Sequence, residues 1–218
     1  MAVIIRGKAN AAVPDAAGYR GYADLARSQR RGRDYAIIVR RRRESRIAVI
    51  APHGGDIEDG TSAIARAIAG DDLNLYLFEG RRRADNYRAL HLTSHRFDEP
   101  LCLDLLARCD AVVAVHGCAG RERRLFLGGL DHGLRDWLAA ALRAAGMRAD
   151  TRGHRFAAVH PENICNRGTT RMGVQIELTQ PLRRGTAAMR VAAAVRCALL
   201  AGAPCYRTSD QLLCGTSR

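Results

Sequence analysis

The stretch Ala48-Val-Ile-Ala-Pro-His53-Gly-Gly-Asp-Ile-Glu58 decides how the fold of this chain is interpreted. Residues 46–51 are mostly apolar and partly β-branched, which predicts a short buried strand that stops at Pro52. Gly54 and Gly55 permit a tight turn, because glycine adopts backbone angles that other residues avoid. Such a turn can bring Glu58 back beside His53. Imidazole and carboxylate are a recurring pair among catalytic zinc ligands, although the same pattern fits a polar turn that caps a strand.

Short apolar strands alternate with amphipathic helices on both sides of this stretch. Strands are predicted over residues 34–39, 46–51, 74–78, 110–116, 125–127 and 174–179, and helices over 19–29, 61–69, 98–108, 131–146 and 186–201. Residues 81–89 and 147–172 are expected to be irregular, and residues 91–97 extended. This alternation indicates an α/β fold with one domain in residues 19–218, preceded by an N-terminal arm in residues 1–18. Its sheet is expected to be mixed, largely parallel and flanked by helices.

The composition fits a globular protein. Of the 218 residues, 47% are hydrophobic, and no apolar run reaches the roughly 18–20 residues that a membrane span requires. Arg6 and Lys8 interrupt the apolar start of the chain before it reaches the roughly 7 residues of a signal-peptide core, so a cytoplasmic protein is expected. The seven cysteines are an odd number without a CxxC pair, which predicts buried thiols and not a disulfide framework.

The net charge of +13 favours an anionic partner. Lys8 is the single lysine among the 35 basic residues. Arginine pairs bidentately with carboxylates as well as phosphates, so an acidic polymer or a small acidic substrate is expected. The arginine runs at 30–33 and 40–43 are expected to be solvated. A nucleic-acid-binding protein is the alternative from another class, but aromatic residues are only 5% and no reading-helix or RNA-sheet motif is present.

Two histidines occupy equivalent positions in the predicted sheet. His53 and His116 each stand at the carboxyl end of a predicted buried strand, and a glycine follows each. Ligands bind in the crevice beyond the carboxyl ends of strands in open α/β sheets. Together with Glu58, the two histidines form a plausible zinc site that leaves a fourth position for water, as a hydrolase requires.

A second acidic residue completes the catalytic hypothesis. In the strand over residues 174–179, alternation places Gln175, Glu177 and Thr179 on one face. A glutamate in an apolar strand is costly unless it is paired or functional. Glu177 is therefore a candidate general base that takes a proton from water and delivers it to the leaving amine. The structural alternative is an edge strand with Glu177 in solvent or paired with an arginine.

The remaining polar candidates are weaker. His91 and His95 are four residues apart but lack the glutamate of the zinc-protease helix motif, so they are interpreted as supporting polar residues. Cys118 is either a soft metal ligand or a packing residue. Three residues in the irregular segment before residue 174 are candidate substrate contacts, with surface solvation as the alternative: Asn166, Arg167 and Arg171.

Several blocks in one order resemble the poly-γ-glutamate hydrolase family of bacteriophages and bacteria, zinc enzymes with a carboxypeptidase-like α/β core. The resemblance runs from about residue 19 to about residue 201. The blocks are PHGGDIEDGTS (52–62), LYLFEG (75–80), HLTSHRFDEP (91–100), VHGCAG (115–120), ICNR (164–167) and GVQIEL (173–178).

The resemblance implies Zn²⁺ bound by His53, Glu58 and His116, with Glu177 as general base. It implies metal-assisted hydrolysis of γ-glutamyl amide bonds in poly-γ-glutamate. A deacylase or carboxypeptidase that acts on small acidic acyl-amino acids is the alternative among enzymes.

Overall fold

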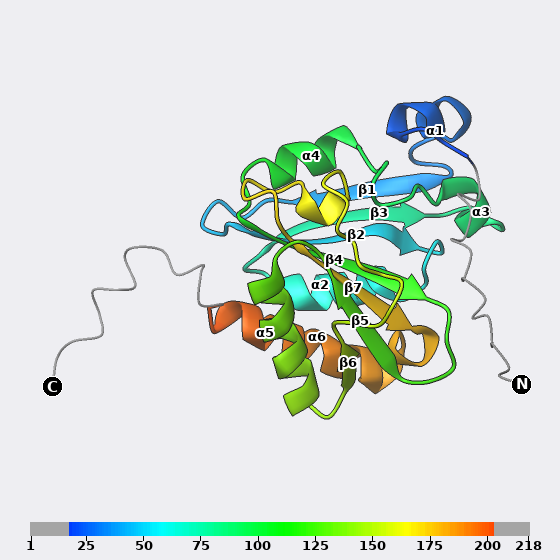
Figure 1. The fold of residues 1–218 in the computed structure, drawn as a ribbon. Helices are drawn as coiled ribbons and strands as arrows, with labels where there is room; N and C mark the ends of the chain where they lie inside the picture. The colour runs from blue at the N-terminus through cyan, green and yellow to red at the C-terminus, as the bar shows by residue number, and fades with distance from the viewer. Residues whose placement is uncertain (1–17, 203–218) are drawn as a thin grey trace, which may run out of the picture.

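The computed structural model describes residues 18–202, which form a seven-stranded sheet in the order β1-β3-β2-β4-β7-β5-β6 (Figure 1). The neighbours β2–β3, β2–β4, β4–β7 and β5–β6 are parallel, and β1–β3 and β5–β7 are antiparallel. The prediction of a mixed, largely parallel sheet is therefore confirmed. The strands are β1 Tyr35–Arg40, β2 Ile47–Gly55, β3 Asn74–Gly80, β4 Ala111–Cys118, β5 Arg124–Gly128, β6 Arg148–Asp150 and β7 Val174–Thr179. Nearly all of the predicted arm, residues 1–18, lies outside the described part of the chain.

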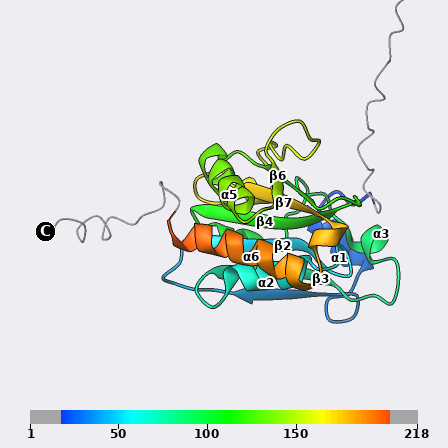
Figure 2. The ribbon, with the colours of Figure 1, turned by 90° about the horizontal axis from the view of Figure 1, so that it is seen from below.

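Helices cover both faces of the sheet. The helices α2, α5 and α6 pack on one face, with α6 against both α2 and α5 (Figure 2), and α1 and α4 pack on the other. The bounds are α1 Tyr22–Ser28, α2 Thr61–Ala69, α3 Asn86–Leu90, α4 Pro100–Leu106, α5 His132–Ala144 and α6 Gly185–Leu200, with 3₁₀ turns η1 Ile164–Asn166 and η2 Gln180–Leu182. Within residues 18–202, no helix is both long and apolar enough to cross a membrane.

Side-chain alternation along the central strands divides the molecule into two cores. In β4, Val113 and Val115 join the core under α2, α5 and α6, whereas Val112 and Ala114 join the core under α1 and α4. A period of two places His116 on the second face. Glu177 of β7 is the register partner of His116. Because β7 lies between β4 and β5, the alternative of a solvent-exposed edge strand is wrong for Glu177.

The strand β2 continues past Pro52, where the sequence predicted its end. Its pairing with β3 steps from Ala51 opposite Leu77 to Gly54 opposite Glu79, which leaves one extra residue on β2. Pro52 falls inside this bulge, where its missing N–H breaks no ladder hydrogen bond. One inserted residue reverses the alternation of side chains, so His53 turns to the face that carries His116.

Three other predictions about local structure differ from the structure. Residues 81–89 were expected to be a loop, but α3 begins at Asn86, whose side chain accepts from Arg82 N (2.9 Å) and donates to Arg82 O (2.8 Å). Residues 91–97 form turns and not a strand, and residues 147–172 contain β6 and η1. Such short elements arise from tertiary contacts more than from propensity. Among the described cysteines, four are buried and Cys197 is exposed, and all five are free thiols.

Candidate metal centre

A cavity of about 830 Å³ lies at the carboxyl ends of β2, β4 and β7. Its lining includes His53, Glu58, His116 and Glu177. Glu58 returns to His53 because Gly55 adopts φ 60° in the turn and Glu58 N donates to His53 O at 2.9 Å. The Thr61 hydroxyl donates to Glu58 O (2.8 Å) and closes the same turn. The turn predicted between His53 and Glu58 is confirmed.

Three side chains with potential metal-ligating atoms converge at the cavity. His53 Nδ1 lies 3.1 Å from Glu58 Oε1 and 3.1 Å from His116 Nδ1. His116 Nδ1 lies 3.6 Å from Glu58 Oε2. Ligand atoms that bind one tetrahedral zinc at about 2.0–2.1 Å are roughly 3.4 Å apart. The spacing of the three side chains therefore fits a shared metal ion.

The hydrogen bond behind His53 supports the same interpretation. His53 Nε2 lies 2.7 Å from the carbonyl oxygen of Leu92, which can only accept, so Nε2 donates to it and Nδ1 is the ring nitrogen that faces the cavity. Nδ1 faces a carboxylate oxygen of Glu58 and a ring nitrogen of His116. A carbonyl partner behind a histidine is the usual support of a metal ligand.

His91 also reaches this group. Its Nε2 lies 3.6 Å from Glu58 Oε1, its ring lies 4.0 Å from that of His53, and His53, Glu58 and His91 have ligand atoms within 4.8 Å of one another. His53, Glu58 and His91 can therefore hold a metal ion. His116 Nδ1 lies beside the same group, 3.1 Å from His53 Nδ1 and 3.6 Å from Glu58 Oε2. His91 is the site residue that the sequence undervalued, and His95 lies instead against the ring of His160 (5.2 Å).

The two buried carboxyl groups have opposite electrostatics. Burial disfavours the charged form of Glu58, but His53, His116 and His91 outweigh it and hold the pKa of Glu58 well below its usual value. Gly117 N also donates to Glu58 Oε2 (2.7 Å). Burial, followed by the charge of Glu58, raises the pKa of Glu177 well above its usual value. Pairs of carboxyl groups with separated pKa values are typical of sites that move protons.

A hydrogen-bonded chain holds Glu177 in place. Gln175 Nε2 donates to Glu177 Oε1 (2.8 Å), and Asn163 Nδ2 donates to Gln175 Oε1 (3.1 Å). Gln175 and Asn163 are buried. The chain fixes one oxygen of Glu177, as a positioned proton acceptor requires.

Comparison with known proteins identifies the family. A family model described as poly-gamma-glutamate hydrolase matches residues 19–190. The chain belongs to this family. It is 37% identical over 143 residues to YoqZ, an SPbeta prophage-derived protein of Bacillus subtilis, an alignment that covers 65% of this chain and 52% of YoqZ. The chain thus spans about half the length of that relative.

Two solved structures of this kind resemble the fold closely. A bacteriophage poly-gamma-glutamate hydrolase superposes with a TM-score of 0.80 at 29% identity, over 84% of this chain and 96% of that one. YndL of Bacillus subtilis, in a structure described as the zinc-free apo form, gives a TM-score of 0.77 at 29% identity with the same coverage. The family resemblance inferred from the sequence blocks is confirmed.

The structure does not bring the three predicted substrate contacts into the cavity of this family member. Asn166 is fully buried, and its side chain accepts from Leu130 N and Gly173 N and donates to Ala158 O and His160 O. Arg167 and Arg171 both pair with Glu162. The loop before β7 thus uses these side chains for its own structure.

Other arginines line the cavity: Arg121, Arg155 and Arg183. Sequence reasoning missed them because each lies in a stretch without a recognisable motif. A spacing signal existed for Arg121, which follows the strand with His116 by three residues. Cys118 also lines the cavity, and burial, followed by the charge of Glu177, raises the pKa of its thiol to about 12. In the metal-free protein this thiol therefore keeps its proton near neutral pH.

Proposed function

We propose that this chain is a zinc-dependent hydrolase that cleaves γ-glutamyl amide bonds of poly-γ-glutamate. The convergence of His53 Nδ1, His116 Nδ1 and the Glu58 carboxylate, beside buried Glu177, carries the proposal. Membership of the poly-gamma-glutamate hydrolase family supports the substrate. The description of the YndL structure as zinc-free supports zinc as the metal.

His53, Glu58 and His116 would hold the zinc. When bound, zinc polarises the amide carbonyl and makes water more acidic. Three protein ligands are typical of catalytic zinc, because they leave a position for the reacting groups. His91, which stacks on His53 and approaches Glu58, would keep both ligands in orientation.

Glu177 would carry the proton. As water attacks the carbonyl carbon, Glu177 takes one of its protons, and it then gives that proton to the nitrogen of the leaving amine when the C–N bond breaks. Its raised pKa suits the first half of this cycle, because the carboxylate accepts a proton more readily than a solvated glutamate does. Its hydrogen bond from Gln175 keeps the carboxylate oriented throughout.

The arginines of the cavity would bind the free α-carboxylates of the polymer, in place of the residues predicted from sequence. Arg183 lies against Gly117, where an added Cβ would be 2.6 Å from Arg183 Nη1. Gly117 therefore lets Arg183 lie directly beside the residue that follows His116. The guanidinium of Arg155 lies 5.0 Å from the centre of the Phe156 ring, which restrains its planar fork on the cavity wall.

The length of poly-γ-glutamate after incubation with the protein tests the proposal. We expect the polymer to shorten with the protein as isolated, to persist when a chelator is present, and to shorten again when zinc is restored. Persistence of the polymer with a zinc-loaded protein would contradict the proposed substrate. Shortening that chelator does not affect would contradict the metal mechanism.

A further inference from the structure

A second, smaller cavity of about 80 Å³ lies beside β5 and β6, lined in part by Arg123, Arg148 and Arg190. β5 is antiparallel to β7, with Leu125 opposite Leu178, so the first residues of β5 lie at the carboxyl end of β7. β6 is parallel to β5, and Arg148 is the register partner of Arg124. The small cavity is thus at the same edge of the sheet as the metal centre.

Two backbone segments, residues 121–123 and 182–183, separate the small cavity from the cavity of about 830 Å³ that holds the candidate metal centre. The larger cavity is called the metal cavity below. Arg121 lines the metal cavity and Arg123 the small one, and Arg183 lines the metal cavity whereas Leu182 lines the small one. Residues one position apart are about 3.8 Å apart between Cα atoms, and residues two positions apart are at most about 7 Å apart. A polymer that leaves the metal cavity over either segment would pass from the face of the sheet that carries His116 to the face under α5 and α6, to which Leu182 of the small cavity belongs.

The arginines of the small cavity retain uncompensated charge. Arg123 and Arg190 form no ion pair with a carboxylate in the described part of the chain. Arg190 Nη2 donates to the carbonyl of Ala145 (2.8 Å), which leaves its other N–H groups for a ligand. Arg148 pairs with Glu122 at 3.4 Å and with Asp150 at 4.0 Å, so its charge is partly compensated. The pair with Glu122 is weak, because the side chain of Glu122 is 70% exposed. Three guanidinium groups around one hollow favour a ligand with several carboxylates.

We propose that Arg123, Arg148 and Arg190 form an exosite for a further segment of the anionic polymer that is being cleaved at the metal centre. This inference rests on the proposed function. Poly-γ-glutamate presents one free α-carboxylate in every unit, so a long chain can occupy both cavities and a short oligomer only one. A second contact on the same chain raises affinity through effective concentration. The exosite would make the enzyme prefer long chains.

The experiment compares long poly-γ-glutamate with a γ-linked oligomer too short to span both cavities. The test variant is Arg123→Gln/Arg190→Gln, which removes two charges and keeps polar side chains. The control variant is Arg43→Gln/Arg108→Gln, which removes the same charge from two exposed arginines at the opposite edge of the sheet. We expect the test variant to lower kcat/KM for the long polymer about threefold to tenfold at low ionic strength, with turnover of the oligomer unchanged. The control variant should retain the preference for long chains.

Binding of the labelled long polymer to the same variants, measured by fluorescence anisotropy, provides a readout that needs no turnover. We expect the test variant to bind more weakly and with a shallower salt dependence than the control variant. Equal loss with both substrates, or equal loss in both variants, would overturn the exosite. Unchanged polymer binding by the test variant would overturn it too. If the wild-type protein binds the polymer through these arginines but cleaves nothing, the proposed function fails, and the arginines form a polymer-binding site that is not an exosite of an enzyme.

Discussion

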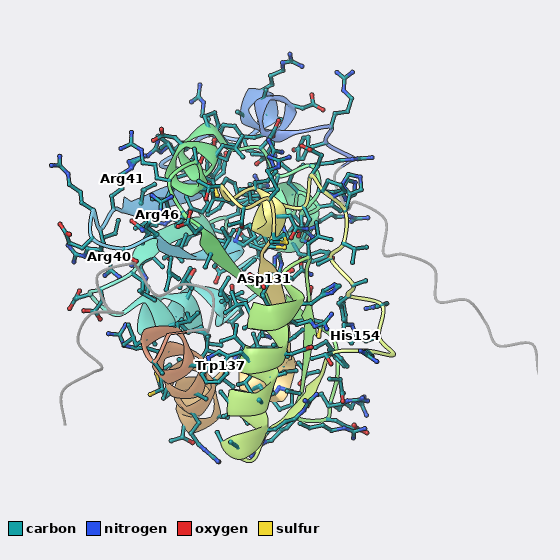
Figure 3. All side chains as sticks on the ribbon, turned by 60° about the vertical axis from the view of Figure 1, so that its left-hand side comes forward. Arg40, Arg41, Arg46, Asp131, Trp137 and His154 are labelled. Carbon is teal, nitrogen blue, oxygen red and sulfur yellow. The ribbon has the colours of Figure 1, made fainter. Side chains whose placement is uncertain are left out.

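Several arginines at one edge of the sheet form ion pairs with aspartates, whereas the arginines that line the candidate metal site at the other edge do not. At the edge where the parallel strands begin, arginines pair with aspartates: Arg40 with Asp71, Arg41 with Asp104, Arg46 with Asp110 and Arg196 with Asp72. At the edge where β2, β4 and β7 end, Arg121, Arg155 and Arg183 line the metal cavity without an ion pair to any carboxylate of residues 18–202. In Figure 3, Arg40, Arg41 and Arg46 lie on the side of the molecule opposite His154, the neighbour of Arg155.

This difference shows that net charge alone does not locate a binding surface. A paired guanidinium has a nearby opposite charge that cancels its field, whereas an unpaired one attracts an anion from solution. Arg121, Arg155 and Arg183 therefore add positive charge beside the candidate metal centre, whereas the four paired arginines add little at the other edge.

We expect the largest effect from loss of a proposed metal ligand, at the edge of the sheet where β2, β4 and β7 end. We expect His116→Ala and His53→Ala each to lower zinc affinity by more than about a hundredfold, beyond what loss of a supporting partner produces, and to abolish turnover. His91→Ala should lower it by at most that amount. Zinc titration with a competing chelator measures all three. An equal loss in the His91 and His116 variants would show that His91 is a ligand.

The second effect concerns the proton and not the metal. Glu177→Gln should keep zinc bound and reduce turnover by at least about a hundredfold, because Gln cannot accept a proton from water. The exposed Glu44 provides the control, and Glu44→Gln should leave turnover unchanged. Metal analysis and polymer hydrolysis on the same samples separate the two contributions. Near-normal turnover of the Glu177 variant would remove its role as general base.

A smaller effect tests the comparison between the two edges directly. Arg155→Gln should raise KM for poly-γ-glutamate about threefold to tenfold, because it removes an unpaired charge beside the metal centre. Arg41→Gln removes an equal charge from a pair with Asp104 at the other edge and should leave KM unchanged. Steady-state kinetics at low ionic strength measures both. Equal increases would mean that overall charge, and not its position, captures the substrate.

The smallest effect is on stability. Folding raises the pKa of Glu177, so the folded metal-free protein favours the protonated carboxyl and loses stability as pH rises above the unfolded value of about 4.3. Above the raised pKa, Glu177→Gln should stabilise the metal-free protein by about 1 kcal/mol, which raises Tm by about 2–4 °C. The gain should shrink as pH falls toward 4.3. Melting curves of chelated protein at several pH values test this, and an unchanged or lower Tm at high pH would contradict it.

Part of the candidate site could be predicted from sequence because strand ends are local features. His53 and His116 follow apolar runs, and the glycines after His53 indicate the turn that returns Glu58. The bulge in β2 could not be predicted, because a proline in this position indicates the end of a strand. The position of the bulge also depends on how β2 pairs with β3, a strand that lies later in the sequence. His91 was undervalued because α3 is five residues long and exists only through contacts with the rest of the fold.

The predicted substrate contacts, by contrast, do not line the cavity. Arg167 and Arg171 are polar residues in an irregular segment, which is how binding residues also look in a sequence. Their pairing with Glu162 is a property of the folded loop. The burial of Asn166 depends likewise on four backbone groups from three different segments.

The sequence by itself determined the α/β class, the strands that end in histidine, and the acidic residue on β7, because hydrophobic periodicity and glycine turns act over a few neighbouring residues. Only the tertiary structure decided that His53 and His116 share one face, that His91 joins them, and which arginines keep their charge for a ligand. Side-chain direction after a bulge and the pairing of charges both depend on residues distant in the sequence, so no local pattern records them.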